Sequence, residues 1–179
     1  TTTSVSLSGV YDKHCFLRTA PSDAVQTPPI AKLVKRLIDV IIPKDIQPDK
    51  TSDEITVGMM TRNDDAYASG LRNGVVSELP SSLLDSDRFK AVTYPNLGRE
   101  EGSDYTKAAS KIADERPDIV MLWGLEEVWT IIGRVDALLE DKLGKTPKTI
   151  YVTADGGKTD DSAMKALEKR PTLKGRVWG

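Results

Sequence analysis

Apolar residues gather in four short runs, and a helix-patterned stretch follows each run along the chain. The runs are separated by polar loops and read ITVGMMT (55–61), FKAVTYP (89–95), DIVMLWG (118–124) and TIYVTAD (149–155). A repeated order of strand and then helix is typical of βαβ units, which build parallel sheets. A short fifth strand is predicted at RVW (176–178). We therefore expect an α/β domain with three αβα layers and a five-stranded parallel sheet in the order 2-1-3-4-5.

The segments outside these runs show the spacing of amphipathic helices. The clearest case has apolar residues at i, i+3, i+4, i+7, i+8 and i+11: Ile30, Leu33, Val34, Leu37, Ile38 and Ile41. Pro43 is expected to end this helix. Similar spacing predicts helices within 68–79, 105–113 and 125–139, and Gly144 is expected to terminate the last of them.

A parallel sheet directs the search for function to the loops after its strands. Ligands of open α/β sheets bind outside the carboxyl ends of the strands, so the loops at 61–67, 123–127 and 154–160 are the candidate region. Trp123 closes the third strand and would face the crevice, or else would only cover the sheet edge. Asp155 stands on a glycine-rich turn, where it could pair with a ligand ammonium or only shape the turn.

The composition of the chain argues against several classes of function. The chain has 179 residues, 39% of them hydrophobic, and a formal net charge of -2, which gives no electrostatic case for nucleic-acid binding. No apolar run reaches the ~20 residues of a membrane helix. The single Cys15 excludes an internal disulfide. The chain starts at Thr1 without a Met, so we expect a processed or shortened chain.

The usual motifs of nucleotide binding and nucleophilic catalysis are not found in the sequence. There is no G-x-G-x-x-G after the first strand, no phosphate-binding loop and no G-x-S-x-G turn. With one His and one Cys, a metal site would need carboxylates alone. We therefore expect no cofactor, no metal and no catalytic residues.

One enzymatic alternative stays open because of two acidic loops, at 63–65 and 155–161. The RNDD loop (62–65) places paired carboxylates after the first strand, where phosphoacceptor domains hold Mg²⁺. Such a domain also needs an Asp after its third strand, and this strand ends in Trp123-Gly124. The alternative is a small α/β phosphoacceptor or Mg²⁺-dependent enzyme. The other interpretation is that these acids form a turn and a helix N-cap.

Several segments, in order, resemble the second lobe of the type 1 periplasmic binding proteins, whose best-known members are receptors for branched-chain amino acids. The resemblance runs from about residue 16 to the end of the chain. It rests on FLRTAPSD (16–23), AKLVKRLID (31–39), MMTRNDDAYASGLRNG (59–74), ERPDIVMLWGLEEVWTIIGRV (115–135), IYVTADGG (150–157) and LKGRVWG (173–179). Each motif is loose alone, but their order and spacing together are fairly specific.

The resemblance implies an organisation and a set of site residues. It implies a stub of the first lobe and hinge at 1–20 and the second lobe at 21–179, with a periplasmic binding protein-like fold. The family's second lobe offers an aromatic, a second aromatic and an acid, which correspond here to Tyr67, Leu125 and Asp155. Leu125 departs from the pattern, and Trp123 two residues earlier could substitute for the lost aromatic.

The implied function is non-catalytic solute binding, for an amino acid or a similar small polar solute, in an ABC-type uptake system or a surface receptor. The implied partners are the solute, a membrane permease or other membrane partner, and the absent first lobe, with a homodimer of the chain as a further option. The implied location is the periplasm or the cell surface, with a lipid anchor on the full-length protein as one option. An isolated lobe would bind solute weakly.

Overall fold

The computed structural model describes residues 23–95, 105–155 and 160–178. Its centre is a five-stranded sheet in which every pairing is parallel, in the order β2-β1-β3-β4-β5. The strands are β1 (Val57–Arg62), β2 (Phe89–Tyr94), β3 (Ile119–Trp123), β4 (Ile150–Thr153) and β5 (Val177–Trp178). The predicted sheet and its strand order are confirmed.

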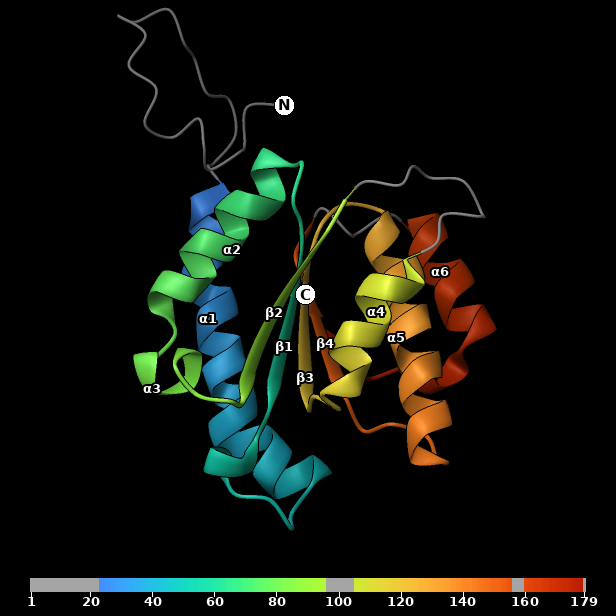
Figure 1. The fold of residues 1–179 in the computed structure, drawn as a ribbon, viewed down its shortest axis with the longest axis horizontal. Helices are drawn as coiled ribbons and strands as arrows, with labels where there is room; N and C mark the ends of the chain where they lie inside the picture. Colours follow the sequence, from blue (N-terminus) through green and yellow to red (C-terminus); the bar gives the residue numbers. More distant parts are fainter. Residues whose placement is uncertain (1–22, 96–104, 156–159, 179) are drawn as a thin grey trace, which may run out of the picture.

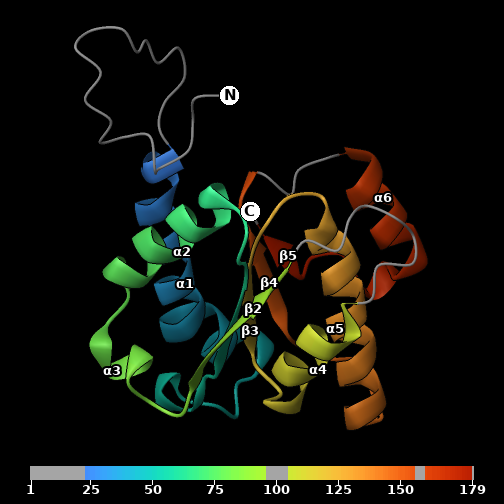
Figure 2. The same ribbon diagram turned by 45° about the horizontal axis from the view of Figure 1, so that its top comes forward.

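Helices cover both faces of the sheet and complete the three layers (Figure 1). On one face lie α1 (Thr27–Arg36), α2 (Ala66–Glu78) and the short α3 (Ser81–Leu84), and on the other α4 (Thr106–Asp114), α5 (Glu127–Leu143) and α6 (Asp160–Lys169). Figure 2 shows β5 at the edge beside β4. Within the described parts of the chain, no helix is long and apolar enough to cross a membrane.

Each face of the sheet buries its own hydrophobic cluster, and β3 contributes to both. Ile119, Met121 and Trp123 belong to the cluster under α1 and α2. Val120 and Leu122 belong to the cluster under α4 and α5. This alternation follows from the period of two in a strand, and a central strand covered on both faces is apolar throughout.

The sequence predicted that the first helix ends at Pro43, and this prediction is wrong. The helix that begins with α1 continues beyond Arg36 as a π-helical segment, Leu37–Ile46, which contains Pro43. The wider π winding is tolerated because Leu37 and Ile42 are fully buried, so side-chain packing outweighs the poorer backbone geometry. Gly144 does cap α5 in a left-handed conformation, with φ 62°, as expected.

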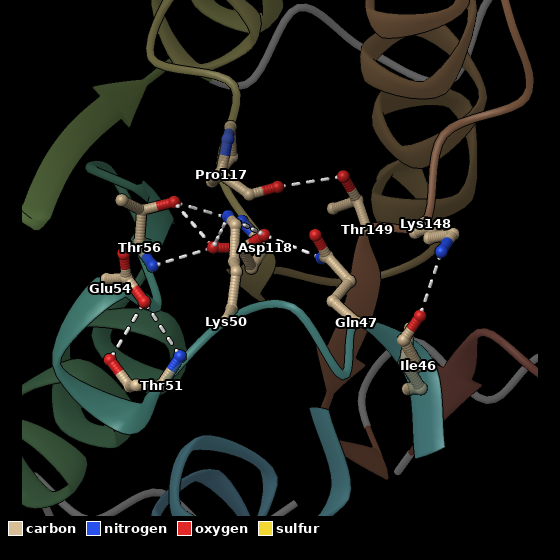
Figure 3. Close-up of polar contacts among 10 residues, drawn as sticks. All are labelled: Ile46, Gln47, Lys50, Thr51, Glu54, Thr56, Pro117, Asp118, Lys148 and Thr149. Carbon is tan, nitrogen blue, oxygen red and sulfur yellow. Dashed lines mark hydrogen bonds and ion pairs between the residues drawn. The ribbon is translucent and has the colours of Figure 1, made fainter. Parts of the chain in front are cut away.

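A buried aspartate fastens the amino end of the sheet (Figure 3). Asp118, just before β3, is 4% exposed and accepts hydrogen bonds from Gln47 Nε2 at 2.7 Å and from Lys50 Nζ at 2.6 Å. The backbone N–H and hydroxyl of Thr56 donate to its other oxygen at 2.9 and 3.0 Å. The polar segment before β1 is thereby tied to the start of β3.

A second buried aspartate holds the end of the chain against α5. Asp136 is fully buried, and its carboxylate accepts from Tyr151 Oη at 3.1 Å, Arg170 Nε at 3.0 Å and Arg176 Nη1 at 2.8 Å. Its charge is thus paired with two guanidinium groups, as a buried charge requires. The cluster links α5, β4 and the segment that leads to β5.

Candidate functional site at the carboxyl edge of the sheet

The carboxyl ends of the strands lie together at the top of Figure 1, next to the start of α2. Strand register aligns the last residues of three neighbouring strands. Arg62 of β1 pairs with Tyr94 of β2, and Thr61 of β1 pairs with Trp123 of β3. Residues far apart in sequence therefore meet at one edge, which is the region predicted to bind a ligand.

Two of the predicted site residues, Tyr67 and Asp155, contact each other directly. Tyr67 lies in the first turn of α2, and Asp155 follows β4. The hydroxyl of Tyr67 donates to Asp155 Oδ1 at 2.6 Å, across 88 residues of sequence. The contact is possible because β1 and β4 flank β3 on its two sides. Asp155 is exposed, so its carboxylate lies at the surface of the edge.

For Trp123 the sequence left open whether its side chain faces the crevice or covers the sheet edge. Its side chain is fully buried in the cluster beneath α1 and α2, and it does not face the crevice. The reason is that Trp123 is still in register with Thr61, so its side chain follows the strand alternation onto a face of the sheet. Its indole Nε1 has no hydrogen-bond partner among the described residues.

Leu125 lies two residues after β3, in the loop that leads to α5. It is partly exposed, and its backbone N–H donates to Glu127 Oε1 at 3.2 Å. A contact of Leu125 or Trp123 with a ligand stays a prediction.

A network that the sequence did not reveal lies at the same edge, around Glu127. Its Oε1 is 3.3 Å from the hydroxyl of Tyr94 and 3.7 Å from Arg62 Nη1. The same hydroxyl is 3.2 Å from the carbonyl oxygen of Trp123. Arg62 also donates from Nε to Asp64 Oδ1 at 2.9 Å. The loops after β1 and β3 and the end of β2 are thus joined by one polar network.

Gly124 makes room for this network. A Cβ atom at Gly124 would lie 2.2 Å from Tyr94 Oη and 2.6 Å from Glu127 Oε1. Both distances are far below van der Waals contact, and the ring that carries the hydroxyl is fully buried. The edge therefore needs a residue without a side chain at this position.

The network perturbs the pKa of its members. Burial, and then the charge of Glu127, raises the pKa of Tyr94 well above its ordinary value. For Arg62, burial acts to lower the pKa, but the hydrogen bond to Asp64 and the charge of Glu127 outweigh it and raise the pKa. Tyr94 is thus neutral and Arg62 cationic at neutral pH.

The acids of the RNDD loop are engaged in local contacts. Asp64 binds Arg62, and Asp65 caps α2 by accepting from the backbone N–H of Tyr67 at 3.1 Å. This arrangement is the turn and N-cap that the sequence offered as the second interpretation. Across the described residues, no group of three His, Cys, Asp or Glu is placed to hold a metal ion. Much of the loop at 155–161 lies outside those residues.

The strand order could have indicated the residues of this network that the sequence analysis missed. Arg62, Tyr94 and Glu127 each lie at or just after the carboxyl end of a predicted strand. In the order 2-1-3, the ends of these strands are adjacent. What the order alone could not supply is the direction of each side chain.

Comparisons with known proteins identify the fold. No protein-family model matches the chain, and no curated protein sequence matches it. Among solved structures, it is similar to a leucine binding protein LivK from Thermotoga maritima, with 17% identity and a TM-score of 0.52 over 84% of this chain. It is also similar to a solute binding protein of an ABC transporter from R. palustris in complex with 4-hydroxybenzoate, with 12% identity and a TM-score of 0.55 over 86% of this chain.

At this level of identity the likeness concerns the fold alone. The chain has the three-layer α/β architecture and strand order of the periplasmic binding protein-like fold. It spans 36% and 35% of the length of the two solved chains. These two neighbours are a leucine binding protein and a solute binding protein of an ABC transporter.

Proposed function

We propose that the chain is the second lobe of a two-lobed solute receptor of the type 1 periplasmic binding protein class. Residues 21–179 form that lobe, and residues 1–20 are a stub of the first lobe and hinge. The carboxyl edge then forms one wall of a solute cleft. The observation that carries the proposal is the contact of Tyr67 with Asp155, because it places a phenol and an exposed carboxylate together at this edge.

The charge of the edge supports a solute that carries an ammonium group, such as an amino acid or a similar small polar molecule. Among the described residues of the edge named here, the acids Asp64, Asp65, Glu127 and Asp155 outnumber the cation Arg62. Closure of a second lobe would desolvate Asp155 and strengthen its pairing with a cation. Tyr67 orients that carboxylate and offers its ring to the ammonium or to apolar parts of the solute.

The expected affinity of the chain by itself is low. A charge-assisted hydrogen bond contributes about 1.5–3 kcal/mol, and an aromatic contact with a cation about 0.5–2 kcal/mol. A dissociation constant of 1 mM requires about 4 kcal/mol. One wall of the cleft therefore supports millimolar binding or weaker.

The proposal also implies partners and a location. The solute enters between this lobe and a first lobe, and the receptor delivers it to the permease of an ABC transporter or to another membrane partner. The receptor acts in the periplasm or at the cell surface, with a lipid anchor as one means of attachment. Self-association of the chain through the edge that faces the first lobe is a further expectation.

The test is a ligand-observed NMR screen of the 179-residue chain by saturation transfer difference. The panel contains amino acids, the same molecules with the amine acetylated, and hydroxybenzoates. We expect saturation transfer to ammonium-bearing members at millimolar concentration, and a strong loss with Asp155→Asn. The matched control is Asp53→Asn, an exposed acid in the segment before β1 at the opposite edge.

Three results would contradict the proposal. One is equal transfer to the acetylated and free amines. Another is an equal loss of transfer with Asp155→Asn and Asp53→Asn. The third is micromolar affinity of this chain alone for an amino acid, because one wall of a cleft cannot supply it.

A further inference from the structure

A groove of about 430 Å³ runs between α5 and α6, on the face of the sheet opposite α2. Figures 1 and 2 both show the two helices side by side. Small residues from both helices, Gly133, Ala137 and Ala166, are among its lining, together with the partly buried Trp129. A Cβ atom at Gly133 would meet nothing within 4 Å. The groove has room for an apolar side chain of another molecule.

Cations outnumber acids in the lining of the groove, where Glu126 is the one acidic residue among the described residues. Arg134 of α5 and Lys165 and Lys169 of α6 line it and are exposed. None of the ion pairs between described residues involves any of them. Lys165 and Lys169 are four residues apart, so they lie on one side of α6. Arg170 also lines the groove, but its guanidinium is held by Asp136 and Glu140.

The positive charge is local, because the chain as a whole has a formal net charge of -2. Cations left without partners on two facing helices attract an anionic partner and set its orientation. The small residues between them accept an apolar group, which gives the contact a desolvated centre inside a charged rim. This combination fits a segment of protein that carries both acidic and small apolar side chains.

We propose that the groove between α5 and α6 docks an acidic segment of a partner protein. Carboxylates of that segment pair with Arg134, Lys165 and Lys169, and one of its apolar side chains rests over Gly133. The inference is independent of the proposed solute site, since Tyr67 and the other residues of that contact lie on a different helix and loop.

Fluorescence polarisation with a labelled peptide of alternating glutamate, alanine and leucine tests the proposal on the whole chain. We expect binding that weakens as salt rises, and no binding of the same peptide with glutamine in place of glutamate. Reversal of charge by Lys165→Glu with Lys169→Glu is expected to weaken binding by about tenfold or more. Gly133→Leu is expected to weaken it by filling the groove. The control is Lys32→Glu with Lys35→Glu, the same charge change on exposed residues of α1.

Thermal unfolding of each variant, followed by circular dichroism, shows whether a variant that has lost binding is still folded. Equal binding of the glutamine peptide would overturn the proposal, as would equal losses from the α6 and α1 reversals. Binding to anionic phospholipid vesicles without binding to the peptide would assign the groove to a membrane surface and reject a protein partner. Self-association through the groove, abolished by the α6 reversal with no peptide binding, would also reject it.

Discussion

At the scale of single residues, the carboxyl edge depends on contacts that tolerate little change. Gly124 lies under the hydroxyl of Tyr94 and the carboxylate of Glu127, and no other residue fits there without displacing one of them. Gly133, on α5, has open space around it. A side chain at Gly124 should therefore disturb its neighbours, whereas a side chain at Gly133 should be tolerated.

We predict that Gly124→Ala destabilises the fold and Gly133→Ala does not. The added methyl at Gly124 displaces the buried phenol of Tyr94, at a cost of about 1–3 kcal/mol in the free energy of unfolding. At Gly133, in the interior of a helix, alanine stabilises by about 0.5–1 kcal/mol. Urea unfolding of both variants measures the difference. Equal effects of the two substitutions would refute the close approach at Gly124.

The raised pKa of Tyr94 predicts a loss of stability at high pH. Below pH 10 the tyrosine is neutral in both the folded and the unfolded chain. Above pH 10 it ionises only when unfolded, because burial and Glu127 raise its folded pKa. The free energy of unfolding then falls by about 1.4 kcal/mol per pH unit for this group. Between pH 10 and 11, the free energy of unfolding should fall less steeply with pH in Tyr94→Phe than in the wild type. Equal slopes would show that Tyr94 does not cause the loss of stability.

Part of the site could be predicted from single residues. Tyr67 and Asp155 were expected at the edge, and the structure brings them into contact. For Trp123 the sequence left open whether it faces the crevice or covers the sheet edge; it is buried, because the last paired residue of a strand still follows its alternation. The network of Arg62 and Glu127 was missed, because side-chain direction in loops depends on packing between distant segments.

At the scale of elements, the linker before β1 shows how a polar segment is fixed. Gln47, Lys50 and Thr56 all donate hydrogen bonds to one carboxylate, that of Asp118, directly before β3 (Figure 3). These hydrogen bonds depend on the pairing of β1 with β3, which the local sequence does not specify. The segment is held by the buried carboxylate of Asp118 and by the burial of Ile55 in the core.

We predict that Asp118→Ala lowers the free energy of unfolding by about 2–4 kcal/mol, since buried donors lose a charged partner. Asp53→Ala, in the same segment but exposed, should change it by less than about 0.5 kcal/mol. Chemical denaturation of the two variants under the same conditions provides the comparison. If the free energy of unfolding falls no more for Asp118→Ala than for Asp53→Ala, the hydrogen bonds to Asp118 do not stabilise the fold.

Among the elements, the helices were predicted by apolar spacing, and α5 ends at Gly144 as expected. The exception is the π-helical continuation through Pro43. Proline normally stops an α-helix, but this rule concerns local geometry. Here Leu37 and Ile42, which precede Pro43 in the same segment, are fully buried, and tertiary packing decides the outcome.

At the scale of the whole molecule, the alternation of strand and helix patterns was enough to predict the layers and the strand order. The identity of the proposed solute does not follow from this pattern, because the chain spans 36% and 35% of the length of its structural neighbours. A cleft between two lobes takes its specificity from both walls. The acid-rich edge and the basic groove between α5 and α6 are two surfaces of opposite charge on the same domain.

The most direct test of the central claim, that the carboxyl edge faces the solute, is to map amide chemical shifts of the labelled chain during titration with a solute found by the screen. We predict shifts at 63–67, 124–127 and 154–155, and their disappearance in Asp155→Asn. Shifts confined to the groove between α5 and α6, or to the opposite edge around Asp118, would contradict the account.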